Sequence, residues 1–248
     1  MIDVAIDAAR QAGQLALKYF KSQPKVFYKP DNTPVTRADK NAEQLIRKII
    51  AKKFPDHGII GEEFEPTNPQ ARFKWIIDPI DGTKNFIRKL PLWCTLLAVL
   101  ENDKPIIGIA YYPYTDEIFT AQKGKGAYLN GKRTYVSKIK NLNRTTINHN
   151  SIYEISNIIK MKNFMELYSQ VENRRNLGSL VHNQFLKGNI DVNIIGGADI
   201  EDFAAPAILT EEAGGKFTDF SGKFSLTSHC GVFSNGLLHQ QVIKLLNS

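Results

Sequence analysis

The stretch at residues 75–86 reads WIIDPIDGTKNF. Its apolar start predicts a buried strand that ends on Asp78. Because Pro79 has a fixed φ and no N–H to donate, we expect the chain to leave the sheet there, with Asp78 and Asp81 converging on one point. Two carboxylates held close together repel each other, and a hard divalent cation such as Mg²⁺ relieves the repulsion. The alternative is an ordinary Pro-Asp turn without a ligand.

The residues that follow Asp81 favour an anion. Gly82 allows backbone to approach a ligand closely, and the N–H groups of Gly82 and Thr83 would open the next segment as an anion-binding end. The stretch therefore predicts a metal site and a phosphate site side by side.

A second apolar run that ends in carboxylates lies at residues 58–63, where Glu62 and Glu63 follow the sequence GIIG. Successive residues of a strand point to opposite sides, so we expect at most one of these glutamates to enter the site. The other would meet solvent or a structural partner.

Two further carboxylates are expected at helix starts. Thr36 and Asp39 have the spacing of an N-cap and an acid three residues later, so Asp39 either completes a cap or faces the same pocket. Asp202 precedes an alanine-rich run that ends in Gly-Gly, and Pro206 requires that helix to begin close to Asp202 or to kink. Capping is again the structural alternative for Asp202.

The rest of the chain indicates a mixed protein. Helical patterns occur near both ends, at residues 3–20 and 237–246, and in between come segments expected to be strands: Leu92–Leu100, Pro105–Tyr112, Glu117–Ala121, a hairpin around Asn130-Gly131, Ile190–Ile195 and Val232–Phe233. Consecutive strands in the middle predict an antiparallel sheet. The segment Lys29–Asp39 is rich in proline and turn residues, so we expect it to be irregular.

Composition narrows the class of protein. The 248 residues are enough for a large core, and no apolar run approaches the roughly 20 residues that span a bilayer, so we expect a cytoplasmic protein without a membrane partner. Cys94 and Cys230 are expected to be buried free thiols. The net charge of +7 is scattered, which suits a small phosphorylated substrate and gives no specific nucleic-acid motif.

Three motifs in this order and spacing resemble the inositol monophosphatase family of magnesium-dependent phosphatases: Gly61-Glu62-Glu63, the run Asp78–Thr83, and the helix from Asp202 to Gly215. The resemblance extends over the whole chain. Within the family, Thr33–Asp39, Asp81–Phe86 and Leu90–Trp93 most resemble the histidinol-phosphatase branch.

The resemblance implies an α+β fold, a layered αβαβα sandwich. It implies an N-terminal half, residues 1–140, with the antiparallel sheet and most metal ligands. A C-terminal α/β half, residues 141–248, would supply Asp202 and substrate contacts. It also favours a homodimer.

The resemblance further implies roles for single residues. Glu62, Asp78, the carbonyl of Ile80 and Thr83 would surround one Mg²⁺, and Asp78, Asp81 and Asp202 would hold a second. A water on the first metal would attack phosphorus without a covalent intermediate, and its proton would pass toward the catalytic residues Glu62, Thr83 and Asp39. Asp81 and the N–H groups of Gly82 and Thr83 would contact the phosphate, and Gly178, Ser179 and Asp199 are candidates for substrate recognition.

Two positions depart from the family pattern. Glu201 stands where many members have tryptophan, and Ile195 stands where many have an acid that contacts substrate hydroxyls or an amine. The resemblance therefore implies a Mg²⁺-dependent phosphomonoesterase, with histidinol phosphate as the first candidate substrate. The alternatives are an inositol-1-phosphate phosphatase, a nucleotide 3′-phosphatase, and a non-catalytic phosphate-binding or RNA-associated regulator.

Overall fold

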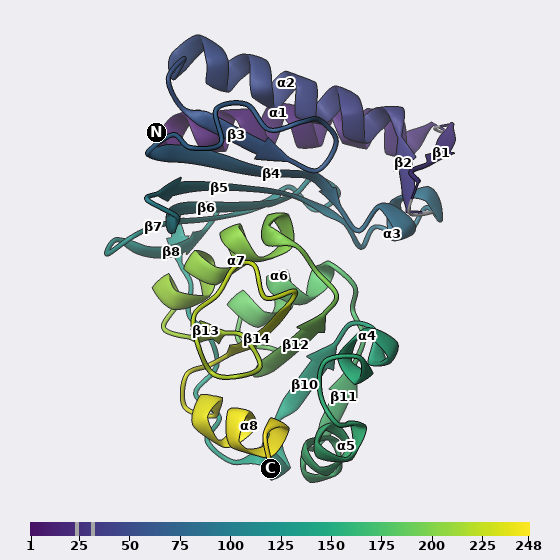
Figure 1. Ribbon diagram of the computed structural model, residues 1–248, viewed down its shortest axis with the longest axis vertical. Helices are drawn as coiled ribbons and strands as arrows, with labels where there is room; N and C mark the ends of the chain where they lie inside the picture. The colour runs from purple at the N-terminus through teal and green to yellow at the C-terminus, as the bar shows by residue number, and fades with distance from the viewer. Residues whose placement is uncertain (23–24, 31–32) are drawn as a thin grey trace.

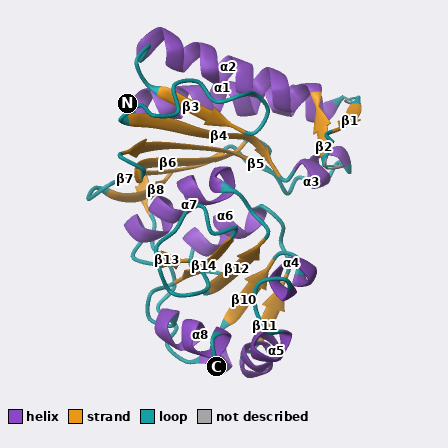
Figure 2. Ribbon diagram, viewed as in Figure 1, coloured by secondary structure: helices purple, strands orange, loops and turns teal. Residues whose placement is uncertain are grey.

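The computed structural model describes residues 1–22, 25–30 and 33–248. Layers of helices and sheets alternate along its longest axis (Figure 1). A helical layer covers the first sheet, two helices separate this sheet from the second, and further helices cover the outer face of the second sheet (Figure 2). The predicted α+β fold, a layered αβαβα sandwich, is confirmed.

The first layer consists of α1 (Ile2–Lys21) and α2 (Arg37–Lys53). α1 buries small residues, among them Ala5, Ala8 and Ala12, and this face packs on the sheet below it. α2 begins at the predicted capping box: the hydroxyl of Thr36 accepts the N–H of Ala38 at 3.0 Å, and Asp39 accepts the N–H of Thr36 at 2.8 Å. The cap prediction for Asp39 is thus confirmed.

The first sheet has the strand order β3-β4-β5-β6-β7-β8-β9 within the described residues. Apart from the parallel pair β3–β4, its neighbours are antiparallel, as predicted for the middle of the chain. Its strands are β3 (Gly58–Gly61), β4 (Phe73–Asp81), β5 (Cys94–Glu101), β6 (Lys104–Tyr112), β7 (Glu117–Gln122), β8 (Gly126–Leu129) and β9 (Lys132–Arg133).

Strand β4 corrects the expectation that the chain leaves the sheet at Pro79, since it continues through Pro79 to Asp81. β3 pairs with β4 only as far as Ile77, so beyond that point β5 is the one neighbour and a missing N–H is tolerated. The pairing with β5 is irregular between Asp78 and Asp81. This bulge, and not an early exit from the sheet, brings the two carboxylates together.

The segment Lys29–Asp39 is not wholly irregular. Pro34–Thr36 forms β2, which pairs antiparallel with β1 (Val26–Tyr28). Pro34 stands at the first position of β2, where its missing N–H is tolerated. Asp31 and Asn32 of this segment lie outside the described residues.

The second sheet has the order β11-β10-β12-β14-β13 and is of mixed direction. The sequence predicted β12 (Val192–Gly196) and β14 (Cys230–Ser234) but missed β10 (Thr146–His149), β11 (Asn173–Arg175) and β13 (Lys216–Thr218). Its outer face is covered by α4 (Ile152–Ser156), α5 (Met161–Gln170) and α8 (His239–Leu246), and a 3-10 turn, η1 (Leu142–Arg144), precedes β10.

Helices α6 (Leu180–Leu186) and α7 (Ile200–Glu212) lie between the sheets. α7 is buried along most of its length and packs against β5 and β6. A Cβ at Gly108 of β6 would lie 2.7 Å from the carbonyl oxygen of Ala205, so glycine there allows the helix to approach the sheet. α7 begins two residues before Asp202, which is the first of the two alternatives that Pro206 left open.

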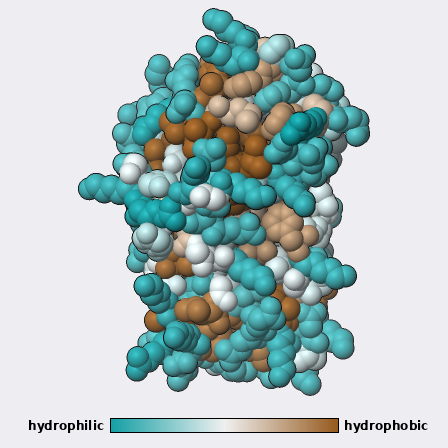
Figure 3. All heavy atoms as spheres, turned by 90° about the vertical axis from the view of Figure 1, so that its left-hand side faces the viewer, coloured by the Kyte–Doolittle hydropathy of each residue, from teal (hydrophilic) through white to brown (hydrophobic). Residues whose placement is uncertain are grey.

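The surface that faces left in Figure 1 is mostly hydrophilic, with hydrophobic residues gathered at the height of α1 and the first sheet (Figure 3). No helix among the described residues has the length and apolar character needed to cross a membrane. Cys94 and Cys230 are both buried and unpaired with each other, as predicted.

Candidate active site

Three carboxylates converge between the end of β4 and the start of α7. Asp78 and Asp81 lie at the end of β4, and Asp202 lies in the first turn of α7. One oxygen from each of them lies within 4.8 Å of the others. They line a cavity of about 780 Å³ together with Glu62, Ile80 and Thr83, among other residues.

Asp78 is the most deeply buried of the three, with 4% of its surface exposed. One of its oxygens accepts the N–H of Ile80 at 3.0 Å, which orients the carboxylate across the bulge. Burial raises the pKa of Asp78 well above its ordinary value, and the nearby charges of Glu62, Asp81 and Asp202 raise it further. The described protein groups thus do not stabilise the ionised form of Asp78, which a bound cation would favour.

Asp81 is held from two sides. Ser179 donates its hydroxyl to Oδ1 at 2.7 Å, and Cys94 places its Sγ 3.5 Å from Oδ2. Burial raises the pKa of Asp81 to about 6, although the hydrogen bonds from Ser179 and Cys94 act in the opposite direction. The predicted recognition residue Ser179 thus orients a carboxylate of the cluster.

Asp202 caps α7 and lines the cavity at the same time. Its Oδ2 accepts the N–H of the N-cap residue Asp199 at 2.9 Å, which completes a capping box. Burial, followed by the charge of Asp81, raises the pKa of Asp202 to about 8. Asp202 can therefore both cap α7 and contact a metal ion, because the cap uses only one of its carboxylate oxygens.

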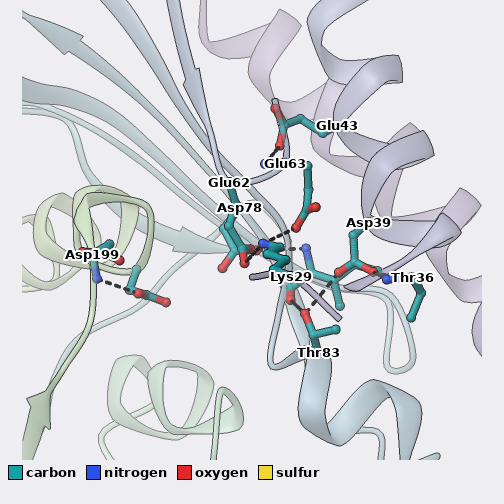
Figure 4. Close-up of polar contacts among 11 residues, drawn as sticks. Lys29, Thr36, Asp39, Glu43, Glu62, Glu63, Asp78, Thr83 and Asp199 are labelled. Carbon is teal, nitrogen blue, oxygen red and sulfur yellow. Dashed lines mark hydrogen bonds and ion pairs between the residues drawn. The ribbon is translucent and has the colours of Figure 1, made fainter. Parts of the chain in front are cut away.

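Thr83 links the cluster to α2. Its hydroxyl lies 3.1 Å from Oδ1 of Asp39 and 3.0 Å from the carbonyl oxygen of Ile80. The other oxygen of Asp39 accepts the hydroxyl of Thr36 at 2.6 Å. Burial raises the pKa of Asp39, and these hydrogen bonds lower it in part. Asp39 completes its cap and still contacts Thr83 (Figure 4).

Glu62 and Glu63 both form ion pairs with the ammonium of Lys29. Nζ of Lys29 lies 2.8 Å from a carboxylate oxygen of each glutamate. The side chain of Glu62 is 36% exposed and lines the cavity, whereas that of Glu63 is 2% exposed and is not among the lining residues. Burial lowers the pKa of Lys29, but the two glutamates outweigh this effect and raise it; burial raises the pKa of Glu63 to about 7. Sequence reasoning missed Lys29, for which no local pattern gives a signal.

Glu43 was also missed, and it holds the turn that carries these glutamates. Its carboxylate accepts the N–H of Glu63 at 2.8 Å and Nε of Arg47 at 2.7 Å, and its side chain has no exposed surface. A Cβ at Gly61 would lie 2.3 Å from Oε1 of Glu43, so a side chain there would displace this carboxylate from its hydrogen bonds. The i,i+4 spacing of Glu43 and Arg47 signals their ion pair but not its contact with the turn.

The predicted phosphate-binding residues lie beside the carboxylates. Gly82 has φ 95°, and a Cβ there would lie 2.6 Å from Oγ of Ser179. It directly precedes α3 (Thr83–Ile87), whose first N–H groups have no partner within the helix. Gly178 and Asp199 also line the cavity, and Asp199 pairs with Nδ1 of His229 at 2.8 Å.

The donor set fits a hard divalent cation. In the described part of the chain, the clustered ligand atoms are carboxylate oxygens and no histidine belongs to the group, which is the preference of Mg²⁺ or Ca²⁺ and not of softer metals. The pKa values of Asp78, Asp81 and Asp202 are raised because the site disfavours their ionised forms, which a divalent cation would stabilise. The ammonium of Lys29 between Glu62 and Glu63 shows that the neighbouring edge already accommodates a cation.

Comparison with known proteins identifies the family. A model of the inositol monophosphatase family matches residues 1–248. The chain therefore belongs to the inositol monophosphatase family, a family of phosphatases, as the three sequence motifs predicted.

Individual relatives carry different names. A protein named histidinol-phosphatase from Chlorobaculum parvum is 34% identical over 235 residues, which are 94% of this chain and 91% of that protein. A protein named Nus factor SuhB from Xylella fastidiosa is 34% identical over 227 residues, 89% of this chain and 82% of its own length. The solved structure of an inositol monophosphatase from Thermotoga maritima has a TM-score of 0.89 and 33% identity, and the match covers 99% of this chain and 96% of that one.

Proposed function

We propose that this chain is a Mg²⁺-dependent phosphate monoester hydrolase that acts on histidinol phosphate. The observation that carries the proposal is the convergence of Asp78, Asp81 and Asp202 beside the Thr83–Asp39 hydrogen bond in one cavity. Membership of a phosphatase family and the histidinol-phosphatase from Chlorobaculum parvum support it. A pure binding protein has no need of this complete set of carboxylates.

The residues present would hold two cations. Glu62, Asp78, the carbonyl of Ile80 and the hydroxyl of Thr83 suit one site, and Asp78, Asp81 and Asp202 suit the second. Mg²⁺ bound there would lower the pKa of the attacking water and stabilise charge on the attacking and leaving oxygens.

The chain itself provides the path for the proton. When the hydroxyl of Thr83 donates to Asp39, the free lone pair of Thr83 Oγ1 can accept a hydrogen bond from the attacking water. As the water loses its proton to Thr83, the proton of Thr83 passes to Asp39, whose raised pKa favours its acceptance. Glu62, which lines the same cavity, is a second acceptor.

The phosphate would bind at the start of α3. The N–H groups of Gly82 and Thr83 lie at the N-terminus of this helix, and Gly82 has no side chain to block a phosphate oxygen. A water beside Thr83 would then attack from that side, and the leaving alcohol would face Asp202 across the cavity.

The wall near the leaving alcohol favours an amine over a polyol. Asp199 and Glu201 are acidic residues on this wall and complement a cationic amine, which histidinol phosphate carries. Ile195 is 8% exposed and offers no acceptor for a hydroxyl. Inositol 1-phosphate is the second candidate, because the Thermotoga maritima structure is that of an inositol monophosphatase.

The proposal includes a cytoplasmic homodimer. Two buried free thiols fit a reducing compartment. Sedimentation at micromolar concentration tests the dimer, and a mass of one chain would contradict it.

The direct test is phosphate release at fixed Mg²⁺ from histidinol phosphate, inositol 1-phosphate and adenosine 3′,5′-bisphosphate, each with an EDTA control. We expect EDTA-sensitive release with a clear preference for histidinol phosphate. A preference for either other compound would keep the chemistry and replace the substrate. No release from any of them would favour the alternative of a non-catalytic phosphate-binding or RNA-associated regulator.

A further inference from the structure

A second polar group lies on the cavity wall, away from the carboxylates. It consists of Asn148 on β10, Asn193 on β12 and His182 on α6, all of which are among the lining residues. Their exposed fractions are 2%, 0% and 4%. Buried amides and imidazoles are costly in a core unless they have partners, so their partners are informative.

The N–H of Leu177 determines how the side-chain amides of Asn148 and Asn193 are oriented. Leu177 donates its N–H to Oδ1 of Asn148 at 2.9 Å, and only the oxygen of that amide can accept it. Nδ2 of Asn148 therefore donates to Oδ1 of Asn193, also at 2.9 Å. Nδ2 of Asn193 is the last donor of this chain of hydrogen bonds, and it has no hydrogen-bond partner among the described residues.

His182 packs on the residue directly opposite Asn193 in the second sheet. Asn193 and Phe233 are directly opposite each other in the antiparallel pair β12–β14, so their side chains share one face of the sheet. The ring of His182 packs edge-on against Phe233, with 5.2 Å between centroids. Burial lowers the pKa of His182 to about 4, so the imidazole is neutral at pH 7. Val181 and Ile195 make the adjoining wall apolar.

This wall suits a particular chemical group. A polyol ring needs a partner for each of several hydroxyls, and Val181 and Ile195 offer none beside the amide of Asn193. A neutral nitrogen heteroaromatic ring has apolar faces and a ring nitrogen that accepts one hydrogen bond. The unpartnered Nδ2 of Asn193 can donate one of its two N–H groups to that nitrogen.

We propose that Asn193 is a specificity-determining residue, whose Nδ2–H donates to the unprotonated ring nitrogen of a substrate that carries an imidazole or similar ring. Asn148 fixes the amide for this task. Because Asn193 has no exposed surface, the substrate ring would reach it when a neighbouring side chain turns aside, and His182, which packs on the directly opposite Phe233, would be that side chain. The inference rests on the proposed function and adds how that substrate is recognised.

The test compares two phosphate esters in one variant. Asn193→Leu removes the donor at nearly constant size, and kcat and KM are measured for histidinol phosphate and for glycerol 2-phosphate, which has no ring. We expect kcat/KM to fall about tenfold for histidinol phosphate, mainly through KM, with glycerol 2-phosphate unchanged within about twofold. Asn163→Leu is the matched control, because Asn163 is also buried but contacts the C-terminal carbonyls of Leu246 and Ser248.

Equal losses for both substrates, or no loss for either, would overturn the inference. If Asn193→Leu does not fold, the same two substrates are measured with His182→Phe. We expect this variant to lose the preference for histidinol phosphate, and an unchanged preference would overturn the inference. Wild-type protein that hydrolyses glycerol 2-phosphate but not histidinol phosphate would overturn the proposed substrate and the inference together. Wild-type activity on histidinol phosphate with unchanged selectivity in the variants would overturn the inference alone.

Discussion

Replacing Asp81 by asparagine should abolish turnover and yet stabilise the metal-free protein. Oδ1 of an asparagine can still accept the hydroxyl of Ser179, so the main hydrogen bond survives. What disappears is one negative charge in a buried cluster that also contains Asp78 and Asp202. Loss of one predicted Mg²⁺ ligand should reduce kcat on the order of 10³-fold or more, as removal of a charge-stabilising group in an active site does.

The stabilisation follows from the pKa of Asp81. Its rise from 3.8 to about 6 means that the ionised carboxylate costs the folded protein about 3 kcal/mol at pH 8, a pH above both values. Between about pH 4 and 6 the folded state binds more protons at this site than the unfolded state, so the cost grows as the pH rises through this window. For a chain of this size, 3 kcal/mol corresponds to an increase in Tm of roughly 6–12 °C.

Thermal unfolding in EDTA at pH 8 and at pH values approaching 4 measures this effect. Asp81→Asn should melt above wild type at pH 8, and the difference should shrink toward zero as the pH falls. Saturating Mg²⁺ should stabilise wild type by more than the variant, because ligand binding to the folded state adds to its stability. Asp56→Asn, an exposed turn residue, is the control and should change neither activity nor Tm. An active variant, or one less stable than wild type at pH 8, would refute the reasoning.

Three further outcomes are expected. Because the pKa of Asp202 is raised to about 8, Mg²⁺ must displace a proton from this residue below that pH. Calorimetry should therefore show that the affinity for Mg²⁺ rises up to about tenfold per pH unit between pH 6 and 8. A pH-independent affinity would contradict this. Gly82→Ala should lose activity and about 1–2 kcal/mol of stability, because φ is 95° and the new Cβ would crowd Ser179. Gly124→Ala is the control: φ is 72° there and no atom lies within 4 Å of the new Cβ, so this variant should lose stability through backbone strain but keep its activity. Lys29→Met should lower the free energy of unfolding by on the order of 3 kcal/mol at pH 8. The loss should be smaller at pH 6, where Glu63, with its pKa of about 7, is protonated. Equal losses of stability in thermal unfolding at the two pH values would argue against the ion pair.

The parts of the site that the sequence predicted are those encoded by local pattern. The apolar run before Asp78 and the spacing of Thr36 and Asp39 each specify an element within a few residues. The error at Pro79 came from a local rule without its context: a proline ends a central strand, but here β3 stops at Gly61 and leaves that side of β4 open. The strands β10, β11 and β13 were missed because three or four residues carry too little periodicity.

The contacts that the sequence did not reveal join distant segments. Lys29 precedes Glu62 by 33 residues, and Ser179 follows Asp81 by 98. Glu43 contacts Glu63 from a different element, although its own helix predicts only the pair with Arg47. Each of these contacts depends on how helices and sheets pack, and residue type and spacing along the chain do not encode that packing.

The position of α7 explains why the carboxylate cluster needs the whole chain. Asp202 is held at the start of a helix that packs on β5 and β6 with one side and on β13 and β14 with the other. One hydrophobic cluster runs through all three layers, from Leu96 through Phe203 to Phe233. Residues 1–140 alone would keep Glu62, Asp78 and Asp81 but would expose the sheet face that α7 covers. A cation that draws Asp202 toward Asp78 and Asp81 therefore also holds the middle layer against the first sheet, so metal affinity and the docking of α7 depend on each other.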